Sequence, residues 1–127
     1  MSRFTLICLG GALGTGARYF LSSWMHGALG ASFPFGTLAV NVIGSFLIAV
    51  LMFVGTETSA MTETTRIVLT TGIMGGFTTY STFSYETMRY VQAGAWAIAA
   101  LNVTVTLLGC LGACFAGWAA ARWLVNV

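Results

Sequence analysis

The chain contains four apolar segments that are each long enough to cross a lipid bilayer, and this feature limits its fold more than any other. They cover about residues 4–25, 35–55, 66–90 and 96–124, and a spanning helix needs about 20 mostly apolar residues. Inside a bilayer the backbone must satisfy its own hydrogen bonds, so apolar segments of this length form helices. The sequence therefore predicts one all-α domain over residues 1–127, an integral, multi-pass membrane protein with four transmembrane helices surrounded by membrane lipid.

The composition supports a membrane protein and argues against a soluble domain, a nucleic-acid-binding protein and a metal site built from cysteines. Only 6% of the 127 residues are charged, whereas a soluble domain carries about 25%. The net charge of +2 is too small to indicate a nucleic-acid partner. Cys8, Cys110 and Cys114 lie in apolar segments and have no metal-ligand spacing with His26, so we interpret them as small core residues.

The third apolar segment contains a stretch, residues 70–86, that is unusual for a membrane helix. Gly75 and Gly76 are adjacent, and a glycine costs roughly 1 kcal/mol relative to alanine inside a helix. The same stretch holds seven hydroxyl side chains (Thr70, Thr71, Thr78, Thr79, Ser81, Thr82 and Ser84). We predict a helix broken near Gly75–Thr79. Broken helices at membrane depth commonly form ion sites, but a seam of small residues for helix packing explains the pattern equally well.

Polar residues recur at helical spacing in two segments, and aromatic residues with an acidic one do so in a third, where packing of the rings is the alternative to a pore lining. A shared face follows from that spacing. The three sets are Thr37, Asn41 and Ser45; Tyr80, Phe83 and Glu86; and Asn102, Thr106 and Cys110. Such sets predict either the polar lining of a pore or structural hydrogen bonds between helices. Glu86 also has Arg89 three residues away, a spacing that allows an ion pair. Arg18 is interpreted either as an electropositive feature near a water-filled entrance or as a side chain that reaches the headgroups.

The arginines are nearly balanced between the two sides of the membrane. Four crossings place Arg3, Arg66 and Arg122 on one side, and Arg18 and Arg89 on the other. Orientation follows the excess of basic residues in cytoplasmic loops. A chain this balanced is predicted to insert in both orientations and to form an antiparallel, dual-topology homodimer, unless Arg3 and the loops decide the orientation.

Two motifs resemble those of a known family, the small dual-topology fluoride channels called Fluc (CrcB). They are GTLAVNVIG (residues 36–44) and GIMGGFTTYSTFSYE (residues 72–86), and Arg18 lies in a further matching context, GTGARY (residues 14–19). The resemblance covers the whole chain. It implies a passive fluoride-selective channel, not an enzyme, in the plasma (inner) membrane of a prokaryote, with two pores in an antiparallel homodimer.

The resemblance also implies roles for individual residues. The backbone carbonyls of Gly75 and Thr78 match those that hold a central structural sodium ion in the family. The positions that match or accompany the fluoride path are Asn41, Tyr80, Phe83, Ser81, Thr82, Asn102, Thr106, Cys110, Arg18 and Glu86. Two of them depart from the family pattern: Tyr80 stands where phenylalanine is usual, and Cys110 is a weaker hydrogen-bonding group than a hydroxyl.

The chemistry of fluoride agrees with these residue types. A pore must replace the water of a small, tightly hydrated anion with hydrogen-bond donors, and aromatic rings present a positive edge to it. A small dual-topology multidrug or cation exporter is the alternative. That exporter requires a membrane-embedded carboxylate, whereas the only acidic residue within the four segments is Glu86, near an end.

Overall fold

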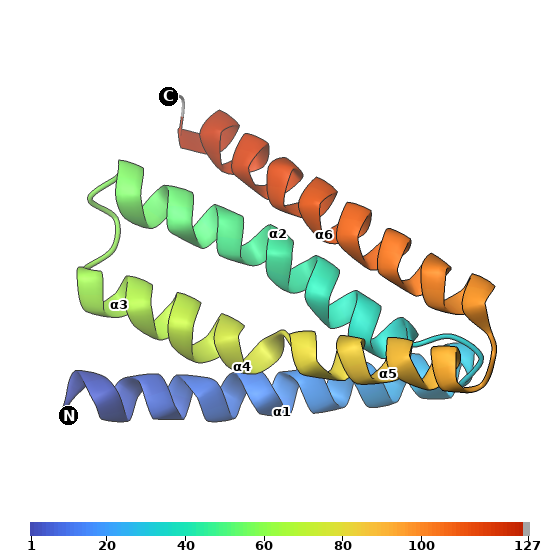
Figure 1. Ribbon diagram of the computed structural model, residues 1–127. Coiled ribbons are helices and arrows are strands. Elements are labelled where there is room, and N and C mark those ends of the chain that lie inside the picture. Colours follow the sequence, from blue (N-terminus) through green and yellow to red (C-terminus); the bar gives the residue numbers. More distant parts are fainter. Residues whose placement is uncertain (126–127) are drawn as a thin grey trace.

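A computed structural model of the protein, which describes residues 1–125, is helical, and the predicted all-α fold is confirmed. Three helices in this part of the chain are long and apolar enough to cross a membrane: α1 (Arg3–Leu29), α2 (Phe35–Glu57) and α6 (Trp96–Val125). The remaining crossing consists of four pieces: α3 (Glu63–Ile67), η1 (Val68–Met74), α4 (Gly75–Phe77) and α5 (Tyr80–Gln92). Figure 1 shows that the crossings alternate in direction, so the first residue and the end of α6 lie at the same end of the molecule.

Local sequence explains where several of these helices begin and end. The hydroxyl of Ser2 accepts a hydrogen bond from the Thr5 amide at 3.3 Å, and that of Thr62 accepts one from the Thr65 amide at 3.1 Å. These are N-caps, which satisfy amides that have no partner in the first helical turn. After α1 and after α5 the chain turns at Gly30 and Gly94, whose φ angles of 78° and 72° favour glycine. The connections are consequently short and the crossings pack as neighbours.

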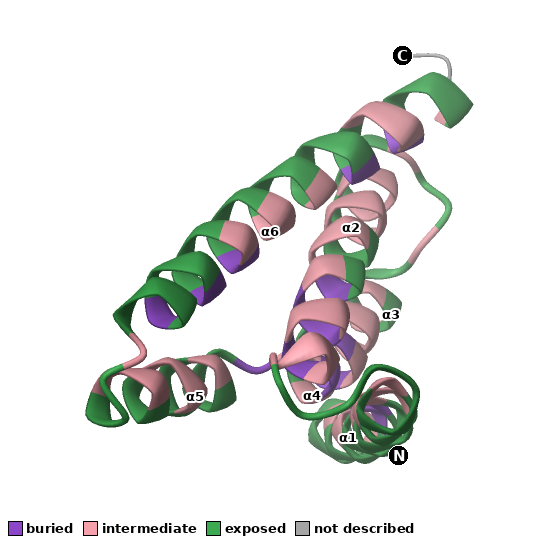
Figure 2. Ribbon diagram, turned by 90° about the vertical axis from the view of Figure 1, so that its right-hand side faces the viewer, coloured by how far each residue is buried: buried purple, intermediate pink, exposed green. Residues whose placement is uncertain are grey.

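The packed core is small and the outer surface is apolar. α2 packs against α6 on one side and against α1 and η1 on the other. Val40, Met74 and Phe77 form the buried apolar cluster at the centre. Figure 2 shows that the outward faces of α1 and α6 are largely exposed. These faces carry large apolar side chains, among them Phe4, Leu13, Phe20, Leu108, Leu111 and Phe115. Such a surface is suited to lipid or to a second protein, not to water.

α1 lies unusually close to the third crossing because glycines face it. A Cβ atom built on Gly14 would overlap the carbonyl oxygen of Ile73, and one built on Gly76 would overlap the carbonyl oxygen of Gly11. Only glycine allows backbones to approach this closely in a membrane. These contacts fix η1 and α4 against α1, and with them the position of the helix break.

The third crossing is interrupted at Thr78 and Thr79, inside the predicted range of residues 75–79. Both residues have extended backbone, with ψ angles of 159° and 111°. Gly75 and Gly76 themselves stay helical, since Gly75 has φ −62° and ψ −37° and both residues belong to α4. Gly76 is needed at this position because α1 lies too close for any side chain. Before the break, η1 is a stretch of π-helix, in which the amide of Gly75 reaches the carbonyl of Thr70, and such stretches occur frequently at functional sites.

Candidate functional site

The break in the third crossing frees backbone groups that a continuous helix would pair. In a regular helix the Thr79 amide would donate to the Gly75 carbonyl, and the Thr82 amide to the Thr78 carbonyl. Here the Thr79 amide donates to Asn41 Oδ1 at 2.8 Å, and the Thr82 amide donates to Thr79 Oγ1 at 3.3 Å. The carbonyls of Gly75 and Thr78 therefore lose their helical donors. Oxygen atoms freed in this way are the groups that bind cations in broken membrane helices.

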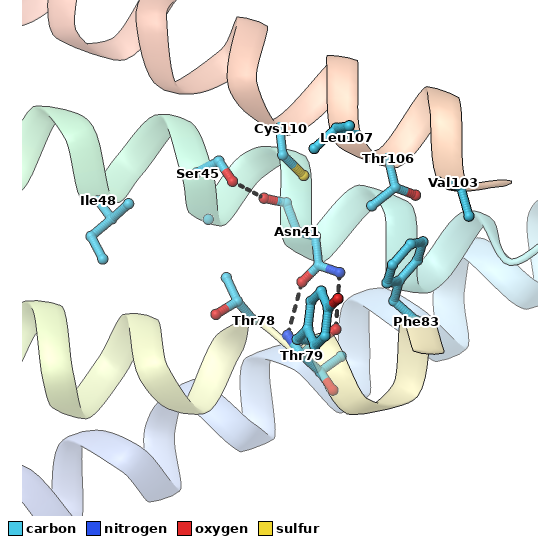
Figure 3. Close-up of a pocket in the computed structure, with 12 residues that line it drawn as sticks. Asn41, Ser45, Ile48, Thr78, Thr79, Phe83, Val103, Thr106, Leu107 and Cys110 are labelled. Carbon is cyan, nitrogen blue, oxygen red and sulfur yellow. Dashed lines mark hydrogen bonds between the residues drawn. The ribbon is translucent and has the colours of Figure 1, made fainter. Parts of the chain in front are cut away.

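Asn41 of α2 holds the break with two hydrogen bonds. Its Oδ1 accepts from the Thr79 amide at 2.8 Å, and its Nδ2 donates to the Thr79 carbonyl at 3.0 Å (Figure 3). Asn41 is 8% exposed. Because its oxygen must face the Thr79 amide and its nitrogen the Thr79 carbonyl, the orientation of the side-chain amide is fixed. An asparagine amide has a second N–H, so one donor of Asn41 is not needed to hold Thr79. The carbonyl of Asn41 also accepts a hydrogen bond from Ser45 Oγ, at 2.7 Å.

A cavity of ≈ 480 Å³ lies beside the break, between α2 and α6 (Figure 3). Most of its wall is apolar, with a few polar groups from three elements. The lining residues are Asn41, Gly44, Ser45, Ile48, Thr78, Thr79, Tyr80, Phe83, Val103, Thr106, Leu107 and Cys110. The first turn of α5 begins at this cavity, and the first amides of a helix lack internal partners and carry a partial positive charge. The cavity thus combines donors with a low-dielectric wall, as small-ligand sites do.

Five of the residues predicted for the ion path meet at this cavity: Asn41, Tyr80, Phe83, Thr106 and Cys110. The rings of Tyr80 and Phe83 have centroids 5.7 Å apart and planes inclined at 52°. Tyr80 is 80% exposed, so its ring stands at the open side of the cavity. Because the two rings are tilted relative to each other, they can present an edge as well as a face to the cavity.

The other helix residues predicted for the path are engaged elsewhere. Asn102 is 1% exposed and donates to Thr87 Oγ1 at 2.9 Å. Ser81 is exposed, and Thr82 accepts a hydrogen bond from Thr79 Oγ1 at 2.9 Å. None of the three lines the cavity. In this chain Asn102 ties α6 to α5, while the Thr82 hydroxyl supports the cap of α5.

The two charged residues predicted for the path have partners on other helices. Glu86 Oε1 accepts a hydrogen bond from Thr37 Oγ1 of α2 at 2.8 Å, and its Oε2 is buried without a hydrogen-bond partner among residues 1–125. Within that same range Glu86 forms no ion pair with Arg89. Arg18 Nη1 donates to the Thr78 carbonyl at 3.3 Å. Arg18 thus contacts the break, although it does not line the cavity.

Thr79 has a role at the site that sequence analysis did not assign, since the residue is named there only among the hydroxyls and at the end of the predicted break. Its backbone pairs with Asn41 and its hydroxyl caps α5, so it connects α2 to the start of the second half-helix. A threonine directly before the first residue of a helix is a recognisable N-cap signal. The clustering of seven hydroxyls in residues 70–86 concealed it.

The fold and the site together define a class: a small four-crossing membrane protein whose interrupted helix exposes backbone groups beside a cavity with polar donors. Residues 5–118 match the family described as "CrcB-like protein, Camphor Resistance (CrcB)". The chain belongs to this family, and the resemblance stated from its motifs is confirmed.

Similar proteins extend over nearly the full length of the chain. It is 52% identical over 126 residues to a "Fluoride-specific ion channel FluC" of Anaeromyxobacter dehalogenans, an alignment that covers 99% of this chain and 100% of that protein. A protein of the same name from Sorangium cellulosum is 49% identical over 125 residues, covering 98% of each chain. One from Citrifermentans bemidjiense is 46% identical over 124 residues, covering 98% of this chain and 100% of the relative. These names describe ion channels and not enzymes.

Proposed function

We propose that this protein is a fluoride-specific ion channel that lets fluoride leave the cell passively. The observation that carries the proposal is the cavity at the helix break, which brings hydrogen-bond donors and aromatic rings together in an apolar wall. The relatives named as fluoride-specific channels align along almost the entire chain, which supports the same function here.

The lining residues suit a small anion. The second N–H of Asn41 is a donor that replaces lost water. The Thr106 hydroxyl donates to Asn102 Oδ1 at 3.4 Å, so it would have to rotate away from Asn102 to donate to the ion. The positive edges of the Tyr80 and Phe83 rings favour fluoride without binding it as tightly as a full charge would. Conduction requires binding that is weak enough to release the ion, and neutral donors in series meet that requirement.

We further propose that the channel is an antiparallel homodimer with two pores. Support comes from the side of α5 that includes Tyr80, Ser81 and Thr82, because all three are exposed in the single chain. Polar groups at membrane depth face protein or water-filled cavities, not lipid. A second copy would cover this side, and the balance of arginines favours both insertion directions.

A central sodium ion is part of the proposal, held by the carbonyls of Gly75 and Thr78 from both subunits. These two oxygens fit the role because the break removes their helical donors. Thr78 retains acceptor capacity beside its bond with Arg18, since a carbonyl oxygen has two lone pairs. When bound, the cation would offset the cost of bringing an anion to the membrane centre.

The test is fluoride efflux from liposomes that contain the purified protein, followed with a fluoride-selective electrode. We expect rapid fluoride release and no chloride release from matched liposomes loaded with chloride. Comparable rates for both anions would contradict a fluoride-specific channel. No release above that of protein-free liposomes would contradict the channel function itself.

A further inference from the structure

We infer that Arg18 is a positioning residue that holds the Thr78 carbonyl, and through it the helix break, in register with the ion cavity. The starting observation is a hydrogen bond from Arg18 Nη1 to the Thr78 carbonyl at 3.3 Å, between residues 60 positions apart. Thr78 itself lines the cavity, and Thr79 and Tyr80, which follow it, do so as well. A residue that fixes Thr78 therefore acts on three successive lining residues without touching the ion path.

The Thr78 carbonyl has lost its ordinary partner. The Thr82 amide, which would pair with it in a continuous helix, is bonded to Thr79 Oγ1 at 3.3 Å. A carbonyl without any partner is unfavourable at membrane depth, so in the single chain, as distinct from the proposed sodium-bound dimer, the Thr78 oxygen needs another donor. Arg18 supplies that donor, a charged group at the long end of hydrogen-bond distance from the carbonyl.

α1 is built to deliver Arg18 to this point. Gly10, Gly14 and Arg18 follow one another at intervals of four residues and share one helical face. Gly10 and Gly14 are both buried against the third crossing, where added Cβ atoms would meet Val68 O and the backbone of Ile73. This glycine contact places the next turn of α1, with Arg18, beside the end of α4.

Arg18 and Asn41 hold adjacent residues of the break from different helices. Arg18 of α1 binds the Thr78 carbonyl, while Asn41 of α2 binds both backbone groups of Thr79. Two neighbouring extended residues are thus fixed from two directions. Loss of either anchor should let the start of α5 shift relative to α2.

Two roles are possible for Arg18, a positioning residue or a positive charge at the pore entrance. They predict different effects when the side chain is replaced. An entrance charge acts over distance through water, and salt screens it within about 8–10 Å. A direct bond to a carbonyl is screened little, and its loss should alter the geometry around Asn41. The inference depends on the proposed fluoride channel only for its flux measurement.

The test compares Arg18→Gln, Arg18→Lys and the original protein by two measurements. The first is the side-chain amide spectrum of asparagine-labelled protein in micelles, where the chain has three asparagines, Asn41, Asn102 and Asn126, and Asn41→Asp identifies the signal of residue 41. The second is fluoride efflux from liposomes at low and high ionic strength. Arg89→Gln is the matched control, because it removes a positive charge from the same side of the membrane, outside the break.

We expect Arg18→Gln to shift the Asn41 signal and to slow efflux about tenfold or more at both ionic strengths, in line with losing a charge-assisted hydrogen bond. Arg18→Lys, which keeps a charged donor, should recover part of both properties, and Arg89→Gln should leave the Asn41 signal in place. An unchanged Asn41 signal with a defect only at low salt would overturn the inference in favour of an entrance charge. If Arg18→Gln does not fold, an unshifted Asn41 signal and full efflux in Arg18→Lys at both salts would likewise overturn it. If the original protein moves no fluoride, the proposed function fails, while the spectra still decide the role of Arg18.

Discussion

Replacement of Gly14 by alanine should destabilise the protein by a predictable amount. The added Cβ would overlap the Ile73 carbonyl oxygen and would lie 2.9 Å from both Ile73 C and Phe77 N. All of these are backbone atoms of η1 and α4, which cannot rotate away as a side chain can. α1 must therefore move outward, and overpacking of this kind costs about 1–3 kcal/mol. At this chain length that corresponds to a melting temperature lower by roughly 4–12 °C.

Gly16→Ala is the matched control, two residues further along the same helix. A Cβ at Gly16 would have no atom within 4 Å, so the substitution adds only the helix propensity of alanine, worth up to about 1 kcal/mol. Thermal unfolding of both variants in the same detergent is the assay, and Gly14→Ala should also slow fluoride efflux because α1 carries Arg18. Equal melting temperatures for the two variants would show that the close approach of α1 to the third crossing does not exist.

Four further predictions concern the cavity and the topology. Phe83→Ile should slow fluoride efflux severely with a stability change below about 1.5 kcal/mol, while Phe115→Ile, on the exposed face of α6, should not; full-rate efflux through Phe83→Ile would mean that the ring serves packing. Tyr80→Phe should conduct at least as fast as the original chain, because it keeps the ring edge and removes a hydroxyl; slower initial efflux would show that this hydroxyl is used. Asn41→Ala should slow efflux and lower the melting temperature, since two bonds to Thr79 are lost and an unpaired buried group costs about 1–3 kcal/mol; an unchanged melting temperature would contradict the role of Asn41 in holding the break. Tagged termini should be accessible to labelling from both sides of the membrane. Labelling from one side only would exclude the antiparallel dimer.

The membrane fold could be predicted from the sequence because a bilayer leaves few alternatives. An apolar stretch such as residues 35–55 must form a helix in hydrocarbon, whatever its neighbours do. The polar faces could also be predicted, since Asn41 and Ser45, or Thr106 and Cys110, are separated by one helical turn. These pairs do line one cavity in the structure.

The partners across helices could not be predicted, because spacing along one helix says nothing about the helix opposite. Glu86 bonds to Thr37 of α2 instead of pairing with Arg89, its neighbour in sequence. The break lies within the predicted range of residues 75–79, but the sequence does not show which of these residues leave helical geometry. Gly76 stays helical and serves the close approach of α1. The extended residues are Thr78 and Thr79. The Thr79 cap of α5 is a local contact, whereas the bond from Thr79 to Asn41 joins residues 38 positions apart and depends on tertiary packing.

The central claim, that fluoride passes through the cavity at the helix break, can be tested at Cys110. This thiol lines the cavity, while Cys8 and Cys114 lie outside it. Both of these residues are exposed, so their interpretation as core residues is wrong. A protein with Cys8→Ser and Cys114→Ser should lose fluoride efflux after treatment with a bulky methanethiosulfonate reagent, because the attached group fills the cavity. The Cys110→Ser protein, which keeps the other two thiols, should be unaffected by the same treatment. Undiminished efflux through a protein whose Cys110 is shown by mass spectrometry to be fully modified would contradict the account.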